Sequence, residues 1–164
     1  MTLSYLSRAL EPARPKGAPP WFVQADGELL SLQTAGLRLD YAQVTQALDE
    51  ARSHRNNGVA SKSIDSLQTA VEMYQGPFLE GLDDEWAIEE RNHVHQRILN
   101  ACLRLTALLR AGRSPDAALW ARRAIEIAPH SIDAHEALVE ALEGGPPHEI
   151  DAARAQLVAL LNAD

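Results

Sequence analysis

Apolar residues follow two different patterns along this chain, and the change falls near residue 40. Before it, the strand-like segments 21–25 and 28–32 flank Asp26-Gly27, a dipeptide that favours a tight hairpin turn. After it, apolar residues recur every three or four positions, which is the period of an amphipathic helix. The sequence therefore predicts a small β-hairpin followed by a run of helices.

Six helices are expected after the hairpin. Asp40 and Gln43 are placed as a capping pair for the first, and the carboxylates of residues 83–85 suit the electropositive start of the third. The first begins at residue 40, and the third starts at residues 83–85 and runs to about 111. The others cover about 61–74, 115–127, 131–143 and 149–162. Consecutive helices pair as three hairpins, so the predicted fold is all-α with a small N-terminal β-hairpin.

Small residues in the middle hairpin have an informative spacing. Gly112 separates its helices, Ala117, Ala121 and Ala124 follow on one face, and Pro129 ends the unit. Small side chains let two helices approach closely. This spacing resembles a tetratricopeptide repeat of about 34 residues, so we expect a tetratricopeptide-like array of helical hairpins.

A proline-rich segment separates the first residues of the chain from the hairpin. Pro12, Pro15, Pro19 and Pro20 surround Gly17, a composition that no helix tolerates. We therefore expect residues 11–20 to form an extended connector.

One stretch carries a more specific resemblance. Residues 74–87 read YQGPFLEGLDDEWA, and Glu90-Arg91 follow them. This motif resembles the bacterial transcriptional activation domain of SARP-type regulators, and the resemblance extends over about 40–164. It implies a non-enzymatic protein-interaction or oligomerisation module of a bacterial transcription regulator. The partners implied are a second copy or the transcription machinery.

The resemblance also covers the first 39 residues. In such regulators a winged-helix DNA-binding domain precedes the helical domain. Residues 3–10 are similar to the end of its recognition helix, with Ser4, Ser7 and Arg8 as a remnant of the DNA contact, and the hairpin is similar to its wing. The domain's upstream helices are missing, so the resemblance implies a fragment that has residues 1–39 as a winged-helix remnant and 40–164 as the activation domain. DNA would be bound only through the complete winged-helix domain of the parent protein.

Charge supports a partner other than DNA. The chain has 15 basic and 23 acidic residues, a net charge of −8. Residues 1–40 are neutral overall, so the whole excess lies in the helical segment. This sign disfavours nucleic acid and anionic membrane surfaces, and it favours a protein-binding or assembly module.

Little in the sequence suggests catalysis, a cofactor or a metal. A single cysteine, Cys102, excludes a disulfide framework and fits a cytoplasmic protein. The apolar runs are too short to span a membrane. Phosphate-binding and nucleophile motifs are lacking, and the paired carboxylates Glu89-Glu90 and 83–85 are interpreted as features of a helix start. The histidines, none of which are spaced i, i+4 as a helical metal site requires, are His54, His93, His95, His130, His135 and His148.

Two groups of residues are candidates for partner binding. Asp133, Glu136, Glu140 and Glu143 recur at steps of three and four and form an acidic stripe on one helix. The stripe is either a solvated face or, in a general tetratricopeptide scaffold, an acidic concave face that receives a basic peptide. Trp86 and Trp120 stand among helical apolar positions and either seal the core or contact a partner.

Overall fold

The computed structural model describes residues 8, 10–27, 29–33 and 39–162. The chain divides into two compact units, Met1–Leu39 and Asp40–Asp164, which are described separately below.

The first unit contains an antiparallel hairpin of β1 (Val23–Asp26) and β2 (Leu29–Leu32), in which Val23 pairs with Leu32 and Asp26 with Leu29. This confirms the small β-hairpin, with a shift in the turn. Asp26 closes β1, so the turn begins after it, at Gly27. Gly27 has φ +60°, a left-handed conformation that glycine adopts without a steric penalty.

Residues 11–20 are not the extended connector that their prolines predict. Two turns fold them back on themselves, closed by hydrogen bonds from Arg14 N to Glu11 O (3.1 Å) and from Ala18 N to Pro15 O (3.1 Å). Proline excludes a helix here but is favoured in turns, where its fixed φ is already suitable.

The buried carboxylate of Glu11 stabilises this arrangement. Its Oε1 accepts hydrogen bonds from the backbone N–H groups of Trp21 (2.9 Å), Phe22 (2.7 Å) and Val23 (3.4 Å), and its Oε2 pairs with Arg14 Nε at 2.8 Å. The bond from Phe22, together with those from Val23 and Trp21 and the charge of Arg14, lowers the pKa of Glu11 although burial opposes the shift.

The second unit is the predicted helical array. Its described residues form six helices: α2 (Asp40–Asn56), α3 (Ala60–Met73), α4 (Glu85–Ala111), α5 (Ala117–Ile127), α6 (Ile132–Ala141) and α7 (Pro147–Leu161). All six lie where the apolar period places them, with ends that differ by one or two residues from those expected.

The helix starts use fewer side-chain caps than the sequence suggests. Ser131 caps α6, since its hydroxyl accepts from Ala134 N at 3.3 Å. Asp40 accepts from Tyr41 N at 2.7 Å, and not from Gln43 as a capping box requires. The side chain of Asp84, the residue before α4, accepts no capping bond. The acidic residues at the start of α4 are therefore placed for a charge–dipole interaction only.

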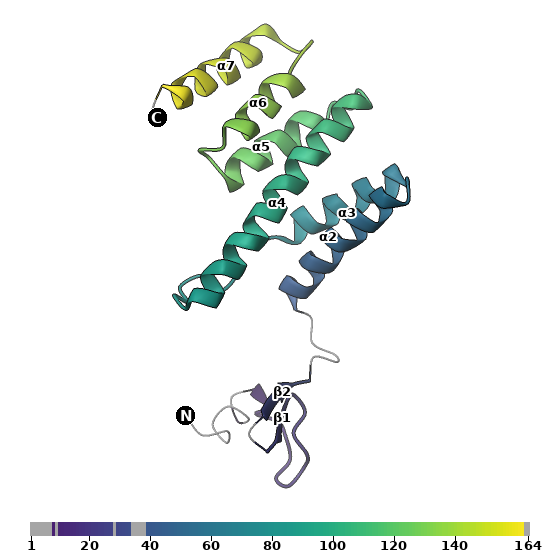
Figure 1. The fold of residues 1–164 in the computed structure, drawn as a ribbon, viewed down its shortest axis with the longest axis vertical. Helices are drawn as coiled ribbons and strands as arrows, with labels where there is room; N and C mark the ends of the chain where they lie inside the picture. Colours follow the sequence, from purple (N-terminus) through teal and green to yellow (C-terminus); the bar gives the residue numbers. More distant parts are fainter. Residues whose placement is uncertain (1–7, 9, 28, 34–38, 163–164) are drawn as a thin grey trace. The chain divides into compact units, whose positions relative to one another are not determined.

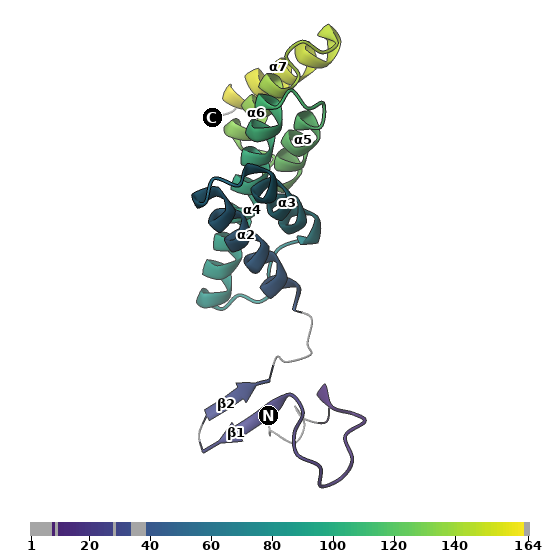
Figure 2. The same cartoon turned by 90° about the vertical axis from the view of Figure 1, so that its right-hand side faces the viewer.

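Helices of the second unit stack in chain order, as Figures 1 and 2 show. Each helix packs against the next, and the first helices of successive hairpins, α2 with α4 and α4 with α6, also contact each other. Repetition of one packing unit along an axis is the property that defines tetratricopeptide-like arrays. The structure therefore confirms the predicted fold class.

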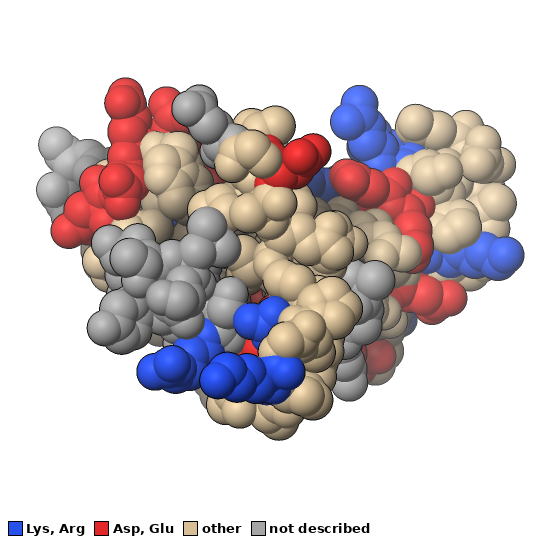
Figure 3. Space-filling model, turned by 90° about the horizontal axis from the view of Figure 1, so that it is seen from below, with Lys and Arg blue, Asp and Glu red and all other residues tan. Residues whose placement is uncertain are grey.

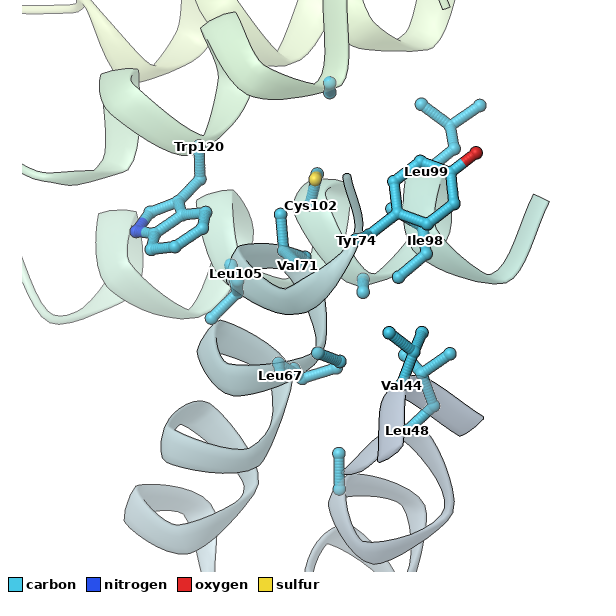
Figure 4. Close-up of a cluster of buried hydrophobic side chains, with 14 of the residues drawn as sticks. Val44, Leu48, Leu67, Val71, Tyr74, Ile98, Leu99, Cys102, Leu105 and Trp120 are labelled. Carbon is cyan, nitrogen blue, oxygen red and sulfur yellow. The ribbon is translucent and has the colours of Figure 1, made fainter. Parts of the chain in front are cut away.

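The core of this unit is built around α4. Ile98, Cys102 and Leu105 of α4 are completely buried, and side chains of α2 and α3 meet them, with Trp120 arriving from α5 (Figure 4). Ala121 and Ala124 of α5 are completely buried as well. The small residues thus allow α5 to pack closely, as their spacing predicts.

Candidate protein-interaction surface

The loop between α3 and α4, residues 74–84, is held in one conformation by Arg91. The guanidinium donates to the backbone oxygens of Phe78 (Nε, 2.8 Å), Leu79 (Nη2, 2.6 Å) and Leu82 (Nη2, 2.7 Å). Leu79 has φ +47°, a left-handed conformation that is costly for a leucine. A fixed guanidinium fork at the centre of the loop compensates for that cost.

Tyr41 of α2 attaches the same loop to the start of the array. Its hydroxyl donates to Glu90 Oε1 at 2.6 Å, and its ring centroid lies 4.5 Å from that of Phe78. The hydrogen bond to Glu90, together with burial, raises the pKa of Tyr41, so the phenol remains a donor. Glu90 is therefore a structural acceptor for Tyr41 and has no capping role. A hollow of about 360 Å³ opens beside Tyr41 and Phe78.

Large apolar side chains stay exposed along this loop and the beginning of α4. Trp86 is 58% exposed, Leu79 42% and Ile88 39%. The exposed carboxylates of residues 83–85 lie between them in the chain. Ile88 follows Trp86 by two positions, about 200° around the helix, so these two side chains face different sides of α4. We call the exposed residues Leu79, Asp83, Asp84, Glu85 and Trp86 the α4-start surface. An apolar group of this kind with an acidic border is typical of a protein contact.

The two tryptophans considered above differ in environment. Trp120 is 7% exposed and seals the core, so it offers nothing to a partner. Trp86 stands in the α4-start surface. The structure therefore places Trp120 in the core, whereas a partner contact by Trp86 stays a prediction.

Three residues of the acidic stripe, Asp133, Glu136 and Glu140, lie on α6, and all four side chains are exposed. Glu143 lies in the turn after α6, which ends at Ala141, so the expected stripe on a single helix is one residue too long. Glu140 already has a partner, because Arg110 of α4 pairs with it at 2.7 Å. Arg110 is near the end of α4, and at about 1.5 Å per residue roughly 36 Å of helix separates it from Trp86. The stripe and the α4-start surface are therefore separate sites.

Of the three proposed DNA-contact residues, Ser4 and Ser7 lie outside the described residues. Arg8 is described and exposed. In the view of Figure 3, basic and acidic side chains both reach the surface.

Two of the remaining candidates for chemistry, Cys102 and His135, are buried. The pKa of Cys102 rises to about 12, chiefly through burial. His135 is buried, with its Nε2 3.0 Å from the backbone oxygen of Pro129. No group of three or more potential metal ligands occurs in the part of the chain that the structure describes. None of the helices in that part has the length and hydropathy that crossing a membrane requires.

The role of Arg91 is the main feature of this surface that the sequence did not reveal. Arg91 belongs to the motif noted above, but all of its acceptors are backbone oxygens. Their positions depend on the path of the loop, which residue types alone do not specify. The left-handed conformation of Leu79 is hidden for the same reason.

One of three comparisons with known proteins gives a match. A search of curated proteins found no match, and a search of solved structures found none either. The family model described as "Bacterial transcriptional activator domain" matches residues 39–144, more than half of the chain. The match contains the hairpins α2–α3 and α4–α5 together with α6, and therefore the whole α4-start surface. This chain belongs to the bacterial transcriptional activator domain family.

Proposed function

We propose that the helical unit is a non-enzymatic protein-interaction module of a bacterial transcription regulator, and that the α4-start surface contacts the transcription machinery. Membership of the activator family supplies the biological setting. The observation that carries the proposal is Trp86, a large apolar side chain that is 58% exposed beside a loop held by Arg91.

Rigidity makes this surface suitable for binding. A side chain on a fixed backbone loses little conformational freedom when a partner covers it, so more of the contact energy appears as affinity. Tryptophan is among the residues most often found at the energetic centre of an interface. Carboxylates at 83–85 favour a partner that is basic around an apolar depression.

Purified bacterial RNA polymerase holoenzyme is the probe that tests this proposal. We expect Trp86→Ala to weaken binding of the immobilised chain about tenfold or more, as truncation of a central interface residue does. Leu119→Ala is the matched control, since Leu119 is a helix residue that is 59% exposed but lies on α5. Absence of binding by the unchanged chain, or equal binding by Trp86→Ala, would contradict the proposal.

Self-association is a second candidate, and the last helix favours it. Two large apolar side chains of α7 are exposed, Val158 by 55% and Leu161 by 51%. We propose that a second copy covers these side chains. The molar mass should then rise with concentration, and Leu161→Asp should keep the chain monomeric.

A third candidate is the acidic stripe, which in a general tetratricopeptide scaffold would receive a basic peptide. Asp133, Glu136 and Glu143 are exposed and available. Arg110 neutralises Glu140 in the middle of the stripe, which favours the α4-start surface as the main contact.

We further propose that residues 1–39 are the end of a winged-helix domain and that the chain is part of a larger DNA-binding regulator. The hairpin supports this, because Leu30 and Leu32 share one face of it and are 57% and 51% exposed, where a complete domain would cover them. In-frame codons upstream for a strand-rich segment and two helices would agree with the proposal. An independent start at Met1 would contradict it.

A further inference from the structure

Four arginines converge on a hollow between α2 and α4, in a protein whose net charge is −8. Arg52 and Arg55 come from α2, and Arg97 and Arg104 come from α4. The hollow has a volume of about 360 Å³. It lies away from the α4-start surface, because its α4 residues follow Trp86 by two to five turns of helix.

Most of this positive charge has no acidic partner. Asp49 is the carboxylate that lines the hollow, and it pairs with Arg97. No ion pair joins Arg52, Arg55 or Arg104 to an acidic group among the described residues. Three guanidinium groups thus remain free to bind an anion.

Arg55 and Arg104 also line a second, smaller hollow of about 180 Å³. Ala60 and Ser63, from the first turn of α3, form another part of its wall. Helix α3 begins without a side-chain cap and has no acidic residue in its first turn. Its N-terminal N–H groups therefore add positive partial charge on the side where the two arginines stand.

The surroundings of Arg104 would make a bound anion electrostatically favourable. Arg104 is half-buried. Burial first, and then the neighbouring charge of Arg55, lowers the pKa of its guanidinium. Two cations held close together at a partly dehydrated position repel each other, and an anion between them would reverse the sign of that interaction.

We propose that Arg55 and Arg104 form a binding site for the phosphate dianion of a small phosphorylated molecule. A dianion compensates both guanidinium groups at once, and phosphate oxygens match the fork of N–H donors that arginine presents. The start of α3 contributes the kind of backbone donors that phosphate groups often bind. The two hollows that share these arginines leave room for the rest of a small ligand.

Isothermal titration of the whole chain with inorganic phosphate and pyrophosphate, at constant ionic strength, tests this site. We expect saturable binding with one site per chain. Arg55→Gln and Arg104→Gln should each weaken it about tenfold or more, because each removes a charge-assisted contact to the phosphate. Arg154→Gln is the matched control, since Arg154 is exposed on α7 and lines neither hollow.

Several results would overturn the proposal. One is that the unchanged chain shows no saturable binding. A second is that Arg154→Gln weakens binding as much as Arg55→Gln does. A third is that Arg55→Gln and Arg104→Gln both bind as tightly as the unchanged chain. Because Arg55 is exposed, Arg55→Gln tests the site even if Arg104→Gln perturbs folding. Succinate that bound as tightly as phosphate would contradict a phosphate site. A short phosphoserine peptide that bound more tightly than pyrophosphate would contradict a small-molecule ligand.

Discussion

The helical unit and the N-terminal hairpin unit reach a defined structure by different means. In the helical unit, side chains from four helices bury one another around α4, and Ile98, Cys102 and Leu105 have no exposed surface. In the hairpin unit, the buried carboxylate of Glu11 binds three successive N–H groups, while Leu29, Leu30 and Leu32 are 75%, 57% and 51% exposed. Burial of apolar side chains thus stabilises the helical unit, whereas hydrogen bonds to a buried carboxylate stabilise the hairpin unit.

This difference should appear most strongly in thiol reactivity. A pKa raised from 9.0 to about 12 leaves Cys102 with a thiolate fraction roughly 1,000-fold smaller at neutral pH. We expect its reaction with a disulfide reagent at pH 8 to be slower by about that factor than in the urea-unfolded chain. In a Cys102→Ser background, Val23→Cys places a thiol in the hairpin unit, where we expect reaction at least about 100-fold faster than at Cys102. Equal protection at the two positions would remove the distinction between the units.

Truncation within the helical core should give the largest loss of stability. Ile98→Ala deletes a completely buried side chain between α2, α3 and α4, and such deletions cost about 2–5 kcal/mol. Urea unfolding followed by circular dichroism measures the change. Ile88→Ala on the same helix is the control, because Ile88 is 39% exposed and its truncation should cost less than about 1 kcal/mol. Similar losses for both variants would mean that α4 is not the centre of the core.

A smaller loss of stability is expected when the hydrogen bonds from Arg91 to the loop of the helical unit are removed. Arg91→Gln removes the fork that holds the carbonyls of Phe78, Leu79 and Leu82, and we expect a loss of about 1–3 kcal/mol. Arg91→Lys keeps the charge but not the fork, so its loss should be intermediate. Amide hydrogen exchange should speed up in residues 76–84 and stay unchanged at α7. Unchanged exchange in the loop would show that Arg91 does not hold it.

The smallest expected effect concerns the hairpin unit and depends on pH. Because folding lowers the pKa of Glu11, the unfolded chain binds its proton more readily. The stabilisation is present above the ordinary pKa of 4.5 and is lost as the pH falls through the lower, folded value. Amide NMR signals of Trp21, Phe22 and Val23 should therefore shift in acid before those of the helical core. In Glu11→Gln this acid transition should be missing, and its persistence would assign it to another group.

Local periodicity explains why so much of the fold could be predicted. Amphipathic spacing locates α2 to α7 because each helix buries one face against its neighbours, and Pro129 and Gly112 mark where helices stop. The turns of residues 11–20 were missed because Glu11 acts on backbone groups ten to twelve residues away. A contact of this kind leaves no period in the sequence.

The candidate sites were harder to predict for a related reason. Sequence reasoning selected Trp86 but could not separate it from Trp120, since both stand among helical apolar residues and only packing decides which is covered. The sequence did not indicate that Arg55 and Arg104 line one hollow. Net charge sums over the chain, whereas Arg55 and Arg104 come together only when α2 lies against α4.

We propose that this chain works through contacts with protein and not with DNA. Light scattering on the purified chain at several concentrations, alone and with a mixed-sequence duplex at low salt, tests that claim most directly. We predict a molar mass that rises with protein concentration and does not change when the duplex is added. A strict monomer whose mass shifts on adding the duplex would contradict the account, because residues 1–39 would then carry a working DNA contact of their own.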